Sequence, residues 1–252
     1  MDRKKIGRTD LEISGIGLGT GTFGREIDQE KAFEIMDYAL ENGITFFDTA
    51  EAYGGGQAYE IRKQSYGTTD VREKSTEMSS SELIIGRWMK SRGTRKNIEL
   101  CTKISGGKAR PDQIRIALDA SLERLGTDFV DIYKIHSPDV STPIAESLDA
   151  MGDQVDLGKI KIIGGANYNG DQITEMLDQA KKNGYRRFEI MQPNYNLAVP
   201  EAETEVFPIC TEEQISITSY SPLGAGFLTG KYIRGDRKSI PKGTRMDVAP
   251  AH

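Results

Sequence analysis

The sequence has few of the features that mark secreted, membrane-spanning or nucleic-acid-binding proteins. Only 2 of its 252 residues are cysteines, Cys101 and Cys210, which is too few for a disulfide framework and typical of a reducing cytosol. No apolar run approaches the roughly 20 residues that a membrane helix needs, and residues 1–6 lack the apolar core of a secretory signal. A net charge of −5 provides no basic surface for nucleic acid. We therefore expect a cytoplasmic globular protein that binds neither nucleic acid nor a membrane.

What the chain does contain is a short segment, residues 44–54, that joins a buried strand to two reactive side chains. Apolar residues run up to Asp48, and Tyr53 follows in a loop. In parallel α/β folds ligands bind at the carboxyl ends of strands, so an aspartate at this position lies where chemistry takes place. Asp48 could instead cap a turn and Tyr53 could simply pack. Lys103 and His136, which close two other apolar strands, favour a functional site.

Strands and helices alternate along the chain and predict an α/β barrel. Seven apolar strands begin near residues 16, 44, 98, 129, 160, 188 and 215, mostly about 30 residues apart. A hairpin over residues 4–14 precedes them. Seven such units favour a (β/α)8 TIM barrel whose eighth unit is missing over a doubly wound sheet. The composition shows no break, so we interpret residues 1–252 as one barrel domain that is incomplete at its C-terminal end.

One motif suggests a different cofactor fold. Gly19, Gly21 and Gly24 have the spacing of the dinucleotide fingerprint, and Asp48 closes the next strand, where a ribose-binding acid would lie. In that fingerprint the third glycine lies in the first helical turn, whereas here the next helix is predicted to begin later, with Asp28 as its cap. The Rossmann fold therefore stays an alternative from this segment alone.

Several local predictions concern loops and helix starts. Residues 57–81 are polar and without helical periodicity, which predicts a long loop insertion that is either a lid or pocket wall or lacks order. Ser79 and Glu82 have the spacing of a capping box for a helix that continues over residues 83–89. Thr142 is predicted to cap, and Pro143 to start, a later helix. Residues 221–252 are predicted to be turn and loop without a strand.

Several segments, taken together, resemble the aldo-keto reductases. They extend over nearly the whole chain in the order found in that family: Gly7-Arg8-Thr9, Gly17 to Gly21, Phe47 to Gly54, Thr102-Lys103, His136 to Asp139, Gly158 to Ile160, Asn167-Tyr168, Gln192 to Leu197 and Tyr220 to Tyr232. The resemblance implies a barrel that binds a nicotinamide cofactor without a Rossmann motif. It also implies a catalytic tetrad of Asp48, Tyr53, Lys103 and His136, and no metal site is expected.

These four residue types suit the reduction of an aldehyde or ketone. The cofactor brings a hydride, and Tyr53 could supply the proton that the developing alkoxide needs, although a free phenol has a pKa of about 10. A neighbouring Lys103 ammonium is expected to lower that pKa, and Asp48 to keep Lys103 charged and aimed. His136 is expected to donate to the carbonyl oxygen, as in an oxyanion hole. Each residue also has an ordinary structural interpretation as a strand-end or backbone-bonded side chain.

The same resemblance implies that the cofactor is NADP, or NAD, and it implies which residues bind it. Asn167 and Gln192 are expected to hold the nicotinamide carboxamide, and Tyr220 to stack on the ring. The further residues expected along the cofactor are Asp48, Thr22, Phe23, Ser221 and Leu223. Strand-end capping is the structural alternative for all of them.

The chain departs from the family pattern in two places. Residues 164–167 read Gly-Gly-Ala-Asn, whereas the family more often has Gly-Val-Ser-Asn, so one hydroxyl near the cofactor is lost. The family's eighth strand and the helix after it, which bind the adenosine phosphate, are not found before His252. An open barrel has two unpaired sheet edges. We therefore expect weak NADPH binding and self-association through these edges, unless a further segment, another chain or a different closure covers the gap.

Three functions are consistent with these residues. The first is an NADPH-dependent carbonyl reductase with Tyr53 as proton donor to a small-molecule carbonyl substrate. The second is a cofactor-binding regulatory subunit that turns over slowly, as in relatives attached to channels. The third is a Schiff-base aldolase on the same barrel, with Lys103 as the nucleophile.

Overall fold

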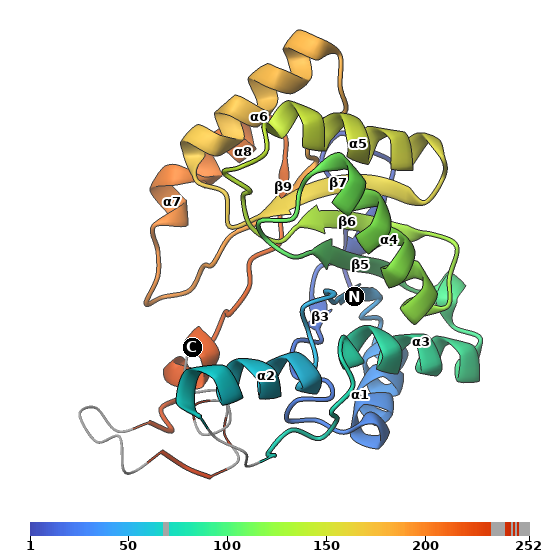
Figure 1. Ribbon diagram of the computed structural model, residues 1–252. Helices are drawn as coiled ribbons and strands as arrows, with labels where there is room; N and C mark the ends of the chain where they lie inside the picture. The colour runs from blue at the N-terminus through green and yellow to red at the C-terminus, as the bar shows by residue number, and fades with distance from the viewer. Residues whose placement is uncertain (68–70, 233–239, 243, 245, 247–252) are drawn as a thin grey trace.

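A curled parallel sheet of seven strands forms the centre of the computed structural model, which describes residues 1–67, 71–232, 240–242, 244 and 246 (Figure 1). Within this part of the chain the strands follow one another in sequence order around half of a barrel. They are β3 (Gly17–Gly19), β4 (Phe46–Asp48), β5 (Glu99–Ile104), β6 (Val130–Ile135), β7 (Ile160–Ala166), β8 (Ile190–Gln192) and β9 (Ser216–Ile217). All seven predicted strands and the predicted α/β barrel type are confirmed.

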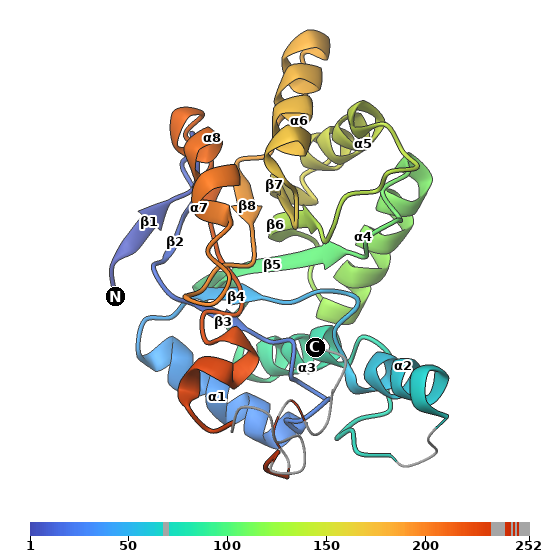
Figure 2. The same cartoon turned by 90° about the vertical axis from the view of Figure 1, so that its left-hand side faces the viewer.

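Helices cover the outer face of the sheet and connect each strand to the next (Figures 1 and 2). Neighbouring helices along the sheet pack against one another, and their apolar sides join the main hydrophobic core. They are α1 (Gln29–Glu41), α3 (Ser80–Arg92), α4 (Pro111–Leu125), α5 (Ile144–Asp156) and α6 (Gly170–Asn183), followed by the short helices α7 (Ala202–Glu205) and α8 (Phe207–Glu212). A short 3-10 helix, η1 (Arg95–Asn97), precedes β5.

The start of α1 decides between the barrel and the Rossmann alternative. The Asp28 side chain accepts a hydrogen bond from the Lys31 backbone N–H, as expected of the predicted cap. The helix therefore begins five residues after Gly24 and does not place its amino end on the glycine-rich turn. Together with the sheet order, this contradicts the Rossmann interpretation of Gly19, Gly21 and Gly24.

The N-terminal hairpin closes one end of the sheet. Its strands, β1 (Arg3–Lys5) and β2 (Glu12–Ser14), are antiparallel. Gly7 N–H donates to Ser216 Oγ at 2.8 Å, and Ser14 Oγ accepts from Thr45 N–H at 3.0 Å, so the hairpin lies against the amino ends of β9 and β4. A second apolar cluster fills the interior above it: Ile6, Ile13, Phe46, Cys101, Ile132, Ile162 and Ile190. The hairpin and this cluster thus close the barrel at the amino ends of the strands, and a ligand would bind at the carboxyl ends.

The predicted loop over residues 57–81 is wrong at residues 57–66 and at residues 80–81, which are helical. Helix α2 (Gly55–Tyr66) follows Tyr53 directly. Its buried residues are two glycines and Arg62, so no apolar stripe gives it helical periodicity. The Arg62 guanidinium instead forms a buried, two-pronged ion pair with Glu73, at 2.7 Å and 3.0 Å. Residues 68–70 lie outside the described residues.

Two predicted helix caps are also wrong. The Ser79 side chain does not cap α3, which begins at Ser80, because Ser79 has a left-handed φ of 52° and its hydroxyl donates to the Glu51 carbonyl at 2.7 Å. Glu82 is buried in the core, where its carboxylate accepts a hydrogen bond from Arg124 of α4 and does not bond back to the start of α3. At α5 the cap position is Pro143, and the Thr142 hydroxyl donates to Asp139 instead.

The two outer strands of the sheet, β3 and β9, each have one neighbouring strand within the described chain. Self-association through these edges stays a prediction. The predicted turn-and-loop tail contains a 3-10 segment, η2 (Gly224–Thr229), and most of the tail beyond it (residues 233–239, 243, 245 and 247–252) lies outside the described residues. None of the described helices is long and apolar enough to cross a membrane.

Candidate active site

Asp48 and Lys103 form a buried ion pair at the carboxyl ends of two adjacent strands. Asp48 is the last residue of β4, and its register partner on β5 is Cys101, so Lys103 lies two residues further toward the carboxyl end of the sheet. The Lys103 ammonium reaches Asp48 Oδ1 at 2.5 Å and the Thr49 carbonyl at 2.7 Å. Lys103 is 1% exposed and Asp48 7% exposed, so this charge pair is shielded from water.

Tyr53 and His136 complete the predicted group of four. Tyr53 lies in the loop between β4 and α2, and the Lys103 Nζ is 4.9 Å from the centroid of its ring. The Tyr53 hydroxyl is 3.4 Å from His136 Nε2, and the two rings meet edge to face. His136 follows β6, and its backbone N–H donates to the Ile104 carbonyl of β5. Four residues that are up to 88 positions apart in the sequence therefore meet at one place.

The charges of Asp48 and Lys103 support each other. Burial alone would raise the pKa of the Asp48 carboxyl, but the Lys103 and Lys134 ammonium groups outweigh it and hold that pKa below its ordinary value. Burial alone would lower the pKa of Lys103, but the Asp48 carboxylate raises it above the ordinary lysine value. Both groups are therefore charged near neutral pH, as expected from the sequence.

Tyr53 and His136 are both kept in their neutral forms. Burial raises the pKa of Tyr53 above 10.0, and the nearby Lys103 ammonium only partly opposes this, so the expected net lowering of the phenol pKa is wrong. Burial, and then Lys103, lower the pKa of His136 to about 4. In these forms the Tyr53 phenol keeps a hydroxyl proton that it can give up, and the His136 imidazole keeps one N–H that it can donate.

Asn167 and Tyr220 stand at the rim of the same end. Asn167 follows β7 with a left-handed φ of 62°, and its amide Nδ2 donates to the His136 carbonyl at 2.7 Å. Its Oδ1 accepts from the Tyr220 hydroxyl at 2.8 Å. Both side chains are exposed and next to each other, so an amide and an aromatic ring face solvent beside the four residues. This donor set fits the carboxamide and ring of a nicotinamide.

The other residues predicted to bind the cofactor differ in how far their side chains are buried. Gln192, the last residue of β8, is buried, and its amide Nε2 donates to Asp48 Oδ2 at 3.3 Å. Phe23 is 1% exposed and its side chain belongs to the main core, and its position along the cofactor stays a prediction. Thr22 is half-buried, and its carbonyl accepts three backbone N–H groups of the following turn. Leu223 is 55% exposed near Ser221, which has a left-handed φ of 54°.

The sequence reasoning missed a second buried lysine, Lys134. It lies in β6, in register with Lys103, and is fully buried. Its ammonium contacts Asp48 Oδ2 at 3.3 Å, Gln192 Oε1 at 3.2 Å and Thr218 Oγ1 at 3.2 Å. The available signal was its spacing of two from His136, because residues two apart in a strand point to the same face.

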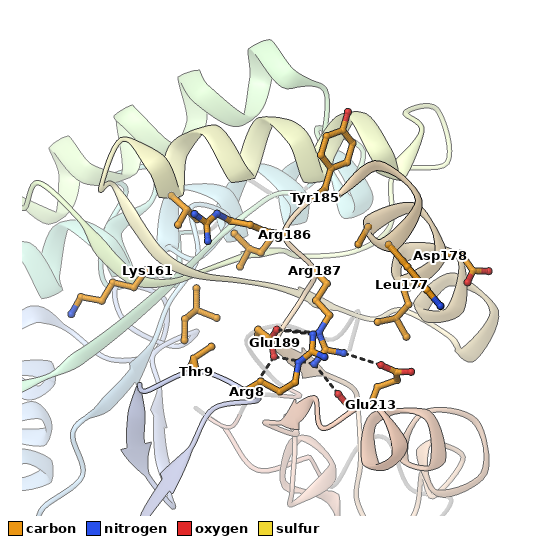
Figure 3. Close-up of a pocket in the computed structure, with 16 residues that line it drawn as sticks. Arg8, Thr9, Lys161, Leu177, Asp178, Tyr185, Arg186, Arg187, Glu189 and Glu213 are labelled. Carbon is orange, nitrogen blue, oxygen red and sulfur yellow. Dashed lines mark hydrogen bonds and ion pairs between the residues drawn. The ribbon is translucent and has the colours of Figure 1, made fainter.

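A cavity lies at the opposite end of the sheet, between the turn of the N-terminal hairpin, the start of β7 and the end of α6. Its volume is about 630 Å³, and none of the four predicted residues lines it. Figure 3 shows Arg187 held between Glu189 and Glu213, with bonds of 3.0 Å and 3.1 Å. Arg186 is likewise paired with Asp156. Both of these arginines are thus already paired with carboxylates.

Comparison with known proteins identifies the family of this chain. The Aldo/keto reductase family model matches residues 15–247, and the chain belongs to this family, whose members are in general carbonyl oxidoreductases. The chain is similar to the uncharacterized oxidoreductase YrpG of Bacillus subtilis (strain 168), with 34% identity over 249 residues that cover 94% of this chain and 71% of that protein. It is also 34% identical, over 249 residues, to a probable voltage-gated potassium channel subunit beta of Arabidopsis thaliana, covering 98% and 70%.

A solved structure shares the fold. The thermostable aldo-keto reductase Tm1743, in complex with the inhibitor epalrestat, superposes with a TM-score of 0.73 at 28% sequence identity. The match covers 90% of this chain and 74% of that one. The curled sheet with its N-terminal hairpin is therefore the aldo-keto reductase arrangement.

Proposed function

We propose that this protein reduces an aldehyde or ketone to an alcohol with hydride from NADPH in the cytoplasm, with Tyr53 as the proton donor. The single observation that carries the proposal is the contact of the Tyr53 hydroxyl with His136 on one side and of its ring with Lys103 on the other. Family membership supports an oxidoreductase that uses a nicotinamide cofactor. The choice of NADPH over NADH follows the habit of the family.

The residues of the site divide the work of reduction. Asn167 and Tyr220 would hold the nicotinamide end of the cofactor, which supplies the hydride when bound. A neutral His136 can donate one hydrogen bond to the carbonyl oxygen and so aim it. Tyr53 then transfers its hydroxyl proton to that oxygen as negative charge develops there. The Lys103 ammonium stabilises the phenolate that remains, and Asp48 holds Lys103 in place.

A second candidate is a regulatory subunit that binds the cofactor and turns over slowly. The observation that favours it is the similarity to the Arabidopsis channel subunit beta, which is as high as the similarity to YrpG. In this case the protein would bind NADPH through the same residues, but steady consumption of NADPH would be slow with every carbonyl compound.

The Schiff-base aldolase receives little support from the contacts of Lys103. A Schiff-base lysine needs a free, uncharged amine with access to substrate. The Lys103 ammonium is 1% exposed and is held by the Asp48 carboxylate and the Thr49 carbonyl. These contacts stabilise the charged form, which has no lone pair for attack.

The proposal is tested by replacing the proton donor. Tyr53→Phe keeps the ring but removes the acidic hydroxyl, so the rate of carbonyl reduction should fall by about 10²–10⁴-fold. NADPH consumption is measured against a panel of aldehydes and ketones, and NADPH binding by fluorescence titration, which should change little. Tyr185→Phe, at the opposite end of the sheet, is the matched control and should keep the wild-type rate.

Three outcomes separate the candidates. A wild-type rate in Tyr53→Phe would show that the assigned proton donor is wrong. Tight NADPH binding without consumption by the wild-type protein, over the whole panel, would favour the regulatory subunit. Absence of both binding and consumption would contradict the two functions together.

A further inference from the structure

Lys134 is the most unusual group of the interior that the proposed reaction does not use. It is fully buried in the middle of the sheet, and its ammonium is surrounded by three oxygens from three strands or strand ends. The ring of Phe46 also lies 5.6 Å from it. A fully buried ammonium is costly unless it is paired and hydrogen-bonded, so a specific partner must hold it there.

That partner is Asp48, which is already paired with Lys103. Oδ1 of the carboxylate accepts from Lys103 and Oδ2 from Lys134, at 2.5 Å and 3.3 Å. In the described part of the chain, Asp48 is the one carboxylate that forms an ion pair with either lysine. Two ammonium groups therefore share one negative charge, and this cluster carries a net charge of about +1.

We propose that Lys134 is a positioning residue. Its ammonium group neutralises the Asp48 carboxylate, so that the positive charge of Lys103 acts on Tyr53 without being balanced by Asp48. Without Lys134, Asp48 would balance Lys103 and the pair would be neutral toward the phenol. With Lys134 present, the cluster has an excess positive charge, and this charge acts on Tyr53 and His136. The inference relies on the proposed function only for the role of Tyr53 in turnover.

The electrostatic effect on the neighbouring groups has a definite sign. Charges on several elements act on His136: Lys103 on β5 and Lys134 on β6 lower its pKa, and Asp48 on β4 raises it. On Tyr53, Lys103 lowers the pKa, whereas burial, Asp48 and the Cys101 thiol raise it. Removal of the Lys134 charge leaves Asp48 less compensated, so both pKa values should rise.

The test compares the neutral variant Lys134→Met with Lys134→Arg, which keeps the charge. The titration of His136 is followed by NMR of its ring proton, which is practical because the chain has 2 histidines and His136→Asn assigns the signal. Ionisation of Tyr53 is followed by ultraviolet absorbance, as the difference between each protein and the same protein carrying Tyr53→Phe. Neither measurement requires turnover.

We expect both midpoints to move upward by about 1 pH unit in Lys134→Met, the size typical of one nearby charge. In Lys134→Arg both should stay near the wild-type values. Lys161→Met is the matched control, because Lys161 lies on β7 and pairs with Asp131 away from this cluster. It should leave both midpoints unchanged. The alkaline limb of carbonyl reduction should move upward together with the Tyr53 midpoint.

The inference is overturned if Lys134→Met leaves both midpoints in place, whatever its effect on the rate. If the variant does not fold, the wild-type protein decides, because a His136 midpoint near 6.5 would contradict an excess positive charge at the site. Shifted midpoints in a protein that reduces no carbonyl compound would support the inference and contradict the proposed function. The two can therefore fail separately.

Discussion

At the scale of single residues, the site depends on which groups are allowed to carry charge. Lys103 and Asp48 are charged because each offsets the burial of the other. Tyr53 is neutral because burial outweighs the effect of Lys103 on its pKa, and His136 is neutral because burial and the Lys103 ammonium both lower its pKa. The proposed proton donor is thus a phenol that would hold its proton until negative charge develops on the substrate beside it. This combination suits acid catalysis better than nucleophilic attack.

The contacts of Lys103 lead to a prediction that separates reductase from aldolase. Because the ammonium is paired with Asp48, it should never bond to a carbonyl substrate. Borohydride added with a carbonyl compound should therefore leave the mass of residues 99–104 unchanged in a digest of the protein. Surface lysines such as Lys90 provide the internal control for non-specific modification. An adduct confined to Lys103 would contradict the reductase mechanism.

At the scale of secondary-structure elements, α3 is held to the sheet by a buried carboxylate. The Glu82 side chain is fully buried and accepts from Arg124 Nε of α4 at 2.6 Å and from the Thr102 hydroxyl of β5 at 2.5 Å. Thr102 precedes Lys103, so this contact links two helices to the strand that carries the proposed catalytic lysine. A carboxylate in this place needs its cation.

We predict that Arg124→Met lowers the free energy of unfolding by about 3–5 kcal/mol, because it leaves the Glu82 carboxylate buried without its cation. Arg87→Met is the matched control on α3 itself. Arg87 pairs with Glu77, both about 45% exposed, and its loss should lower stability by about 0–1 kcal/mol. Urea midpoints at constant slope measure both. Equal losses for the two variants would show that burial of Glu82 does not decide the effect.

At the scale of the whole molecule, stability should fall in mild acid because His136 is partly buried in its neutral form. Its pKa is about 4 in the folded protein and about 6.5 in an unfolded chain. The folded pKa is the lower one, so the stabilisation is complete above pH 6.5 and is lost as the pH falls toward 4. The difference corresponds to roughly 3 kcal/mol.

The prediction is measured by urea unfolding between about pH 7.5 and about pH 4. His136→Asn cannot gain a charge, so the stability advantage of the wild type over this variant should shrink by roughly 3 kcal/mol over that range. Carboxyl groups titrate in both proteins and cancel in the comparison. A constant difference would mean that His136 is accessible to water and protonates freely.

The sequence by itself was sufficient for the architecture and for the four catalytic candidates. Strands rich in apolar residues recur at a regular interval, and a parallel barrel brings all their carboxyl ends to one rim. Residues at the carboxyl ends of strands, such as Asp48 and Lys103, can therefore be assigned to a common site before any distance is known. Asp28 was recognised for a similar reason, because an N-cap bonds within its own turn.

Tertiary contacts alone decided the remaining features. Helix α2 was missed because it is stabilised by the Arg62–Glu73 ion pair and not by an apolar stripe. Ser79 and Glu82 have the spacing of a capping box, yet the Glu51 carbonyl and Arg124 bind them instead. Lys134 is surrounded by strands from distant parts of the chain, and a lysine in a strand says nothing by itself about the partner that keeps it buried. Local patterns report local hydrogen bonds, whereas buried charges are placed by partners that only the folded chain brings together.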